Sequence, residues 1–114
     1  MVYCADHPST ALLETLVQTT RQAVPESYQL IEIDAPDDIA IFEPANPDAL
    51  NQPPDQTRRQ GMDFLSNNRV ALMRVRSVVM PRADNYLLNP LHADAGRILI
   101  QNVQRYPFDT RLIA

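Results

Sequence analysis

The chain has 114 residues, a hydrophobic share of 45%, a net charge of −4 and a pI of about 4.9. This length fits a single domain, the hydrophobic share argues against disorder, and the acidic balance argues against direct binding to nucleic acid or to an anionic membrane. Its single cysteine, Cys4, excludes an internal disulfide and a cysteine-based metal cage, so we predict no metal site. Because the sequence has no apolar run of eighteen residues and no secretion signal, we predict a soluble, cytoplasmic protein.

The first third of the chain predicts a strand, a helix and a second strand. Residues 2–5, VYCA, resemble a short strand, and apolar side chains recur at helical spacing between residues 11 and 17. Ser9 or Asp6 is the expected cap of this helix, and Pro25 is expected to end it. Residues 28–36, YQLIEIDAP, alternate apolar and polar side chains and predict a strand.

The remainder predicts a proline-rich excursion, one helix and further strands. Residues 34–57 hold five of the ten prolines and are expected to form a surface segment, with one short strand at IAIFE. A helix is expected over residues 57–68, ending at an asparagine pair, and a buried strand over residues 69–81, ending at a proline. RILIQNV, residues 97–103, should form another strand. The fold class is therefore α+β, with a mixed β-sheet core and few helices.

The stretch NYLLNPLHADAGRIL, residues 85–99, combines residue types that fix a non-repeating backbone. Asn85 and Asn89 can bond to their own backbone and tolerate unusual torsions, and Pro90 fixes the chain that follows. We therefore expect a rigid corner here. His92 within it could be a base or a ligand, but a single histidine in a turn is more often held structurally by neighbouring carbonyls.

Three other residues are candidates for chemistry. Tyr3 and Glu14 are eleven residues apart, which joins a strand to the first turns of the following helix, so both could face one cleft. The alternative is an exposed helical glutamate beside a core tyrosine. Ser77 lies within or at the edge of an apolar strand, where its hydroxyl needs a partner, most simply the backbone.

Three motifs together resemble the RES domain, the toxin half of bacterial toxin–antitoxin pairs. They are VYCADHPSTALLE, VALMRVRSVVMPRADNYLLNPLHAD and FDTRL, and the resemblance treats residues 1–114 as one RES domain. It implies a fold similar to ADP-ribosyltransferases and cleavage of the nicotinamide–ribose bond of NAD+, by hydrolysis, phosphorolysis or ADP-ribosyl transfer. NAD+ is then a substrate, and no cofactor is required.

The resemblance also assigns site residues and partners. Tyr3, Glu14 and Ser77 match the family's catalytic residues, and with Asn85 and His92 they are expected to bind NAD+. A tyrosine ring can stack on nicotinamide, a carboxylate can stabilise an oxocarbenium-like ribose, and a serine can orient the carboxamide or a phosphate. The expected partner is an Xre-type helix-turn-helix antitoxin, and sheet edges left open would favour homo-oligomers.

One family feature has no match in this sequence. The family carries an arginine in a GGRWN-like stretch before the first strand, whereas the first arginine here is Arg21, at the far end of the expected first helix. We therefore expect the amino-terminal part of the family domain to be missing. The alternative function is a truncated or inactive RES-like module that binds an antitoxin or ligand without turnover.

Overall fold

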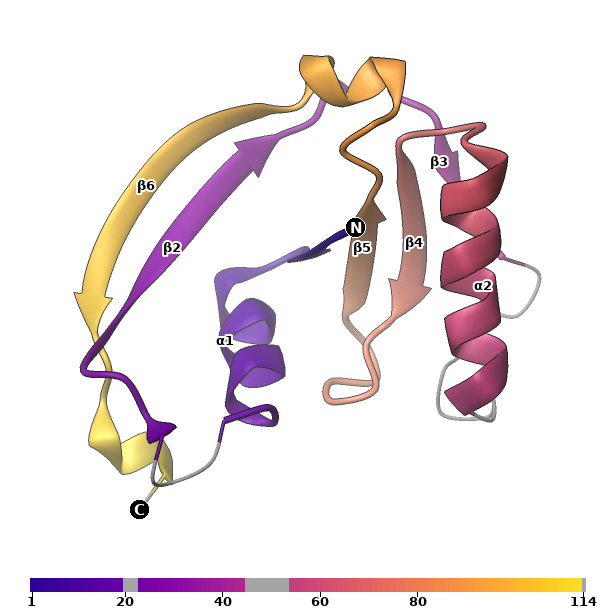
Figure 1. Ribbon diagram of the computed structural model, residues 1–114. Coiled ribbons are helices and arrows are strands. Elements are labelled where there is room, and N and C mark those ends of the chain that lie inside the picture. The colour runs from indigo at the N-terminus through magenta and orange to yellow at the C-terminus, as the bar shows by residue number, and fades with distance from the viewer. Residues whose placement is uncertain (20–22, 45–53, 114) are drawn as a thin grey trace.

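A computed structural model describes residues 1–19, 23–44 and 54–113. The predicted α+β class is confirmed: within these residues two α-helices accompany one mixed sheet and one two-stranded ribbon. The mixed sheet has the order β1-β5-β4-β3, in which only the β3–β4 pair is parallel (Figure 1). Its strands are β1 (Val2–Ala5), β3 (Ile41–Phe42), β4 (Leu72–Arg76) and β5 (Asp84–Leu88).

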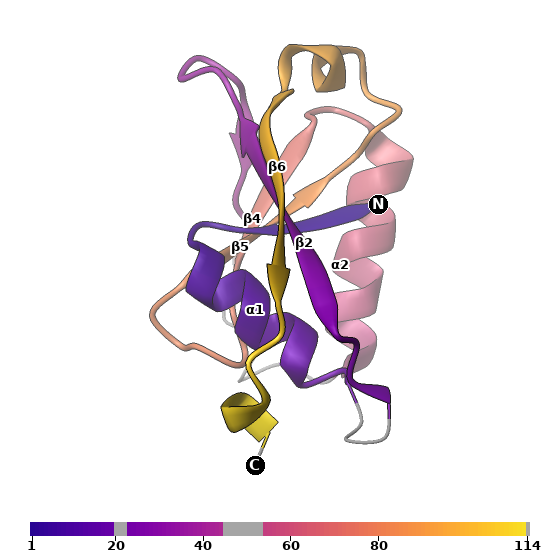
Figure 2. The same ribbon diagram turned by 90° about the vertical axis from the view of Figure 1, so that its left-hand side faces the viewer.

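The second sheet is an antiparallel ribbon of β2 (Ser27–Asp34) and β6 (Leu99–Pro107), with an irregularity between Glu32 and Ile33. Figures 1 and 2 show it as an arch that stands away from the four-stranded sheet and crosses it at an angle. Tyr28 contacts Tyr106 and Phe108 at one end of the ribbon, with ring centroids 6.0 and 6.1 Å apart. Strands were predicted at residues 28–36 and 97–103, and both exist, although the second begins at Leu99 and continues to Pro107.

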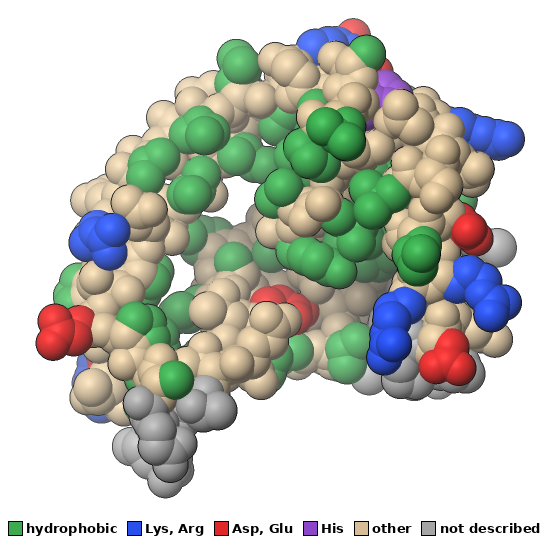
Figure 3. Space-filling view, in the orientation of Figure 1, with side chains coloured by type: hydrophobic (Ala, Val, Ile, Leu, Met, Phe, Trp, Pro, Cys, Tyr) green, Lys and Arg blue, Asp and Glu red, His purple; other side chains and the backbone are tan. Residues whose placement is uncertain are grey.

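Apolar side chains on this ribbon are largely exposed. In the space-filling view, openings separate the ribbon from the rest of the molecule, and hydrophobic side chains line it (Figure 3). A two-stranded ribbon is marginally stable in water by itself, because it has little apolar surface to bury. The exposed large hydrophobic residues of the ribbon are Ile31, Leu99, Ile100, Val103 and Tyr106.

The core lies on the two faces of the four-stranded sheet. On one face, Phe64 of α2 (Pro54–Asn67) packs against Met73 of β4 and Leu87 of β5. On the other face, Leu72 packs with Ile39 and the residues around them. The helix predicted over residues 57–68 is thus present and begins earlier, and its apolar face explains why the sheet is buried where it is.

Helix α1 (Pro8–Leu16) differs from prediction at both ends. His7 is its N-cap, and its Nδ1 accepts a hydrogen bond of 3.1 Å from the Ser9 backbone N–H, so the prediction of Ser9 or Asp6 was wrong. The proline at the first helical position has no N–H to satisfy, which suits this end. The helix stops at Leu16, well before Pro25. Thr15 and Thr19 bond through their hydroxyls to backbone carbonyls there, a competition that disfavours helix continuation.

Strand β4 is shorter than predicted and the corner begins later. The chain leaves the strand after Arg76 and turns, and the Ser77 N–H donates to the Ala83 carbonyl at 2.9 Å. Residues 84–88 are regular strand, so the expectation of a non-repeating path from Asn85 onward was wrong for that part. The apolar–polar alternation of this strand was not recognised in the sequence, because the polar Asn85 occupies an inward-facing position.

The corner itself occupies residues 89–97. Asn89 is almost completely buried, and its Nδ2 donates to Asn68 Oδ1 at 2.8 Å, while its Oδ1 accepts from the Leu91 N–H at 3.1 Å. A short 3-10 helix, η3 (Ala93–Arg97), then leads into β6, and η4 (Thr110–Ile113) follows β6. Within the described ranges, no helix is long and apolar enough to cross a membrane.

Candidate functional site

A hollow of about 590 Å³ opens between β1, α1 and β5. The pairing of Tyr3 with Leu87 and of Ala5 with Asn85 places Tyr3 and Asn85 on one face of the sheet, because alternate side chains of a strand share a face. Helix α1 supplies the opposite wall. The lining residues are Tyr3, Cys4, Ala5, Ala11, Glu14, Thr15, Gln18, Thr19 and Asn85.

The Glu14 carboxylate is held by one of its two oxygens. Oε1 accepts a hydrogen bond of 2.5 Å from the Ser77 hydroxyl and one of 2.8 Å from Asn85 Nδ2. No hydrogen bond to Oε2 is present among the described residues. The two hydrogen bonds therefore fix the carboxylate through Oε1 and leave Oε2 available at the wall of the hollow.

Ser77 lies beneath this carboxylate, not at the surface of the hollow. Its residue surface is 1% exposed, and its Oγ accepts a hydrogen bond of 3.0 Å from the Met80 N–H. The one hydroxyl hydrogen is thus directed to Glu14. The partner is therefore a side chain as well as the backbone that the sequence suggested, and the predicted contact of Ser77 with a carboxamide or phosphate stays a prediction.

Tyr3 presents its ring to solvent at the mouth of the hollow. The residue is 72% exposed, while Glu14 is half-buried. The alternative of a core tyrosine beside an exposed glutamate is therefore wrong. The structure brings Tyr3, Glu14 and Asn85 together around one hollow, with Ser77 connected to it through Glu14.

His92 lies outside this group. Its Nδ1 accepts a hydrogen bond of 2.9 Å from the Asp94 N–H and caps η3, so its ring is held in the corner by a backbone N–H and not by the expected carbonyls. It does not line the hollow. Its predicted contact with NAD+ stays a prediction.

Several lining residues were not singled out from the sequence. Thr15 lies on the face of α1 that carries Ala11 and Glu14, and Gln18 follows in the turn after the helix; the spacing of three, four and seven residues from Ala11 was the available signal. Cys4 lies on β1 beside Tyr3, and burial raises the pKa of its thiol above the ordinary value. The thiol is therefore mainly protonated near neutral pH.

The RES domain family model matches residues 1–110. This chain belongs to the RES domain family. Two relatives agree along nearly its whole length. It is 33% identical over 120 residues to a Sphingobium protein named Prs ADP-ribosylating toxin, and 35% identical over 115 residues to a Pseudomonas putida protein named Toxin Res.

The two alignments cover nearly all of this chain but only part of each relative. They cover 99% and 98% of this RES domain, and 74% and 79% of the Sphingobium and Pseudomonas proteins, respectively. The expectation that the amino-terminal part of the family domain is missing here stays a prediction. Tyr3, Glu14, Ser77 and Asn85 all fall within the residues that the family model matches.

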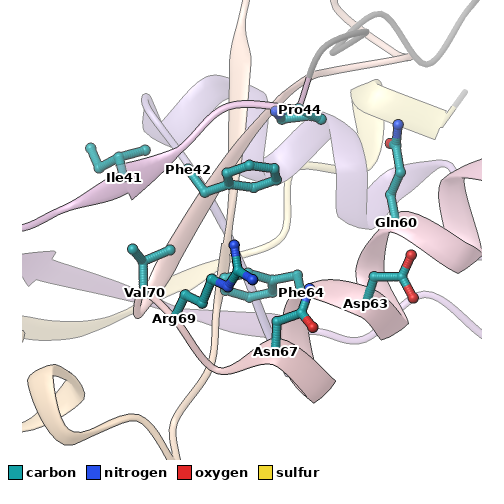
Figure 4. Close-up of a pocket in the computed structure, with 9 residues that line it drawn as sticks. All are labelled: Ile41, Phe42, Pro44, Gln60, Asp63, Phe64, Asn67, Arg69 and Val70. Atoms are coloured by element: carbon teal, nitrogen blue, oxygen red, sulfur yellow. The ribbon is translucent and has the colours of Figure 1, made fainter.

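A second hollow of about 520 Å³ lies between α2 and β3 of this RES domain. Figure 4 shows Ile41, Phe42 and Val70 on one side of it and the polar side chains of α2 on the other. None of the predicted site residues lines it. It is the more apolar of the two hollows, whereas the chemistry-bearing side chains gather around the first.

Arg74, Arg97 and Arg111 form ion pairs away from the first hollow. Arg74 pairs with Glu43 and Arg97 with Asp38. Arg111 contacts both oxygens of Asp109, and these hydrogen bonds hold the pKa of that carboxyl below its ordinary value. This two-point contact lies within the FDTRL motif. Among the described residues, no arginine lines the hollow that contains Glu14.

Proposed function

We propose that this RES domain is a toxin enzyme of a type II toxin–antitoxin system that cleaves the nicotinamide–ribose bond of NAD+. The observation that carries the proposal is Glu14, whose Oε1 is held by two hydrogen bonds while Oε2 has no described partner beside a hollow. Support also comes from membership of the family and from relatives named as toxins, one of them ADP-ribosylating.

The hollow is large enough for a nucleotide fragment, and its lining includes an aromatic ring and a carboxylate. Ligand sites of small molecules are usually about 300–1,000 Å³, and this one is about 590 Å³. The exposed Tyr3 ring offers a stacking face to a flat, cationic pyridinium. Glu14 then lies within the same hollow to meet the adjoining ribose.

The proposed reaction breaks the bond between the pyridinium nitrogen and ribose C1′. The bonding electron pair leaves with nicotinamide, and the ribose carries the positive charge of an oxocarbenium-like species. The Glu14 carboxylate stabilises that charge, because an anion near a developing cation lowers the barrier. Water, phosphate or a protein side chain then forms a bond to C1′, and a water or side-chain acceptor releases its proton.

The test measures nicotinamide release from NAD+. We expect release by the wild type and a loss of about a hundred-fold or more for Glu14→Gln, which keeps the size but removes the charge. Glu32→Gln is the matched control, because Glu32 is exposed on β2 and outside the hollow. Equal release by the wild type and Glu14→Gln would refute catalysis by this carboxylate.

A non-catalytic binding module is the second candidate. The observation in its favour is that no arginine among the described residues lines the hollow, although a bound pyrophosphate would usually be met by one. This candidate predicts binding of NAD+ or of an Xre-type antitoxin, measured by calorimetry, with no release of nicotinamide. Release that depends on Glu14 would exclude it.

A further inference from the structure

Asn85 is connected to the candidate site by its amide nitrogen. It lies on β5, the strand paired on both sides, opposite Ala5 of β1 and Val75 of β4. A side chain at this position is held by two neighbouring strands. Its Nδ2 reaches Glu14 Oε1 at 2.8 Å, and this contact joins helix α1 to the middle of the sheet.

The orientation of the amide is set by charge. If the Asn85 amide were turned over, its Oδ1 would face the Glu14 carboxylate, and two acceptors would oppose each other. In the observed orientation Oδ1 is instead enclosed by the protein, and no described residue forms a hydrogen bond with it. A buried acceptor without a partner is unfavourable by roughly 1–3 kcal/mol. The amide therefore keeps its Nδ2 bond to Glu14, although this orientation leaves Oδ1 without a described partner.

The amide is arranged mainly toward the protein. Oδ1 is buried, and Nδ2 donates one of its two hydrogens to the carboxylate. We infer that Asn85 is a positioning residue, which acts on the substrate through Glu14 and not by contact with NAD+. The inference rests on the proposed function, and it reassigns a residue first expected to bind NAD+ directly.

Two hydrogen bonds to one oxygen fix a carboxylate better than a single one. Ser77 approaches Oε1 from the turn after β4, whereas Asn85 approaches it from β5. With both donors present, rotation about the last side-chain bond of Glu14 would break both contacts. Asn85 therefore determines which way Oε2 points, and misplacement of a reacting group by about 1 Å costs roughly a hundred-fold in rate.

The experiment compares two substitutions that remove the donor in different ways. Asn85→Ala deletes the amide, and we expect kcat to fall about 10- to 100-fold with KM changed less than about three-fold. Asn85→Asp keeps the shape but places a second carboxyl against Glu14. We expect it to be worse than Asn85→Ala at neutral pH, because two like charges in contact disfavour the ionised pair.

The pH dependence separates positioning from a structural role. At low pH the carboxyl introduced by Asn85→Asp is protonated and can donate to Glu14, so the activity ratio of this variant to wild type should rise as pH falls. The ratio for Asn85→Ala should stay flat. If Asn85 served only to fill space, the isosteric Asn85→Asp would be the milder change. An Asn85→Asp variant more active than Asn85→Ala at neutral pH, or a change in KM alone, would overturn the inference.

A double-mutant cycle in urea unfolding distinguishes failure of this inference from failure of the proposed function. Glu14→Ala and Asn85→Ala should be non-additive, whereas Glu14→Ala and Asn102→Ala should add, since Asn102 is exposed on β6. Wild-type protein that releases no nicotinamide refutes the proposed function. Additivity of Glu14 and Asn85 refutes the inference, whether or not the wild type is active.

Discussion

Asn68 and Asn89 are joined by a 2.8 Å hydrogen bond between their side-chain amides, and this bond ties the end of α2 to the end of β5. Asn68 follows the last helical residue with a φ of 49°, a left-handed conformation that asparagine tolerates better than most residues. Asn89 also donates its backbone N–H to the Ala71 carbonyl at 2.8 Å. The corner is therefore closed by side chains as well as by backbone.

Replacement of Asn89 should destabilise the fold. Asn89→Ala leaves the Leu91 N–H and the Asn68 amide without their partner, and we expect a loss of about 1–3 kcal/mol in the free energy of unfolding. Urea unfolding followed by circular dichroism measures it. Asn102→Ala on the exposed face of β6 is the control and should change stability by less than about 0.5 kcal/mol. Equal effects of the two substitutions would contradict the role given to the corner.

Removal of the Ser77 hydroxyl should lower the stability of the fold. Ser77→Ala deprives Glu14 of one donor and leaves the Met80 N–H without its acceptor. We expect a loss of about 1.5–3 kcal/mol, because one of these bonds involves a charged group. Ser66→Ala, at an exposed position of α2, should leave unfolding unchanged or slightly improved. An unchanged midpoint for Ser77→Ala would show that the observed bonds contribute little.

Tyr3 should act through its ring and not through its hydroxyl. If it stacks on nicotinamide, Tyr3→Phe should keep KM for NAD+ within about three-fold, whereas Tyr3→Ala should raise KM about ten-fold. Because the residue is 72% exposed, both variants should fold with nearly wild-type stability. Steady-state kinetics of nicotinamide release provide the comparison. A Tyr3→Phe variant as impaired as Tyr3→Ala would assign the effect to the hydroxyl.

The Cys4 thiol should titrate at a higher pH in the folded than in the unfolded protein. Burial disfavours the thiolate and raises the pKa above the ordinary value of 9.0. The corresponding contribution to stability is fully present below about pH 9 and is lost as pH rises through the folded-state pKa. Alkylation by iodoacetamide should therefore be slower in the folded protein at pH 8 than in urea. Equal alkylation rates in the two states would contradict the shift.

Alkylation of Cys4 also tests where NAD+ binds. Cys4 lines the hollow beside Tyr3, so saturating NAD+ should slow its alkylation in the folded protein. AMP, which lacks nicotinamide, provides the control for general nucleotide effects. Alkylation unaffected by bound NAD+ would place the ligand elsewhere.

Hydrophobic pattern predicted the elements better than their ends. The strands around residues 28–36 and 97–103 and the helix ending at the asparagine pair follow from local composition and are present. The cap of α1 was missed because the imidazole of His7 replaces the usual hydroxyl or carboxylate acceptor. The end of β4 was missed because the run after Arg76 is apolar, although it turns back to Ala83.

The sequence indicated some of the residues around the candidate site but not the contacts between them. Family resemblance indicated Tyr3, Glu14 and Ser77, and strand–helix spacing was compatible with a shared cleft. Spacing could not show that Ser77 would be buried, nor that Asn85 would donate to the same oxygen as Ser77, since these contacts join residues 63 and 71 positions apart. Such geometry depends on the register of β5 with β1 and β4, which no local pattern encodes.

The β2–β6 arch should unfold locally more easily than the four-stranded sheet. Its strands have apolar side chains in water and rest on few other elements, so their amide protons should exchange with deuterium through local unfolding that costs little. Amides of β4 and β5, which are paired within the four-stranded sheet and bury Met73 and Leu87, should exchange only on global unfolding. Since Asn85 lies in the second group, the wall that holds Glu14 should keep its shape while the arch opens and closes.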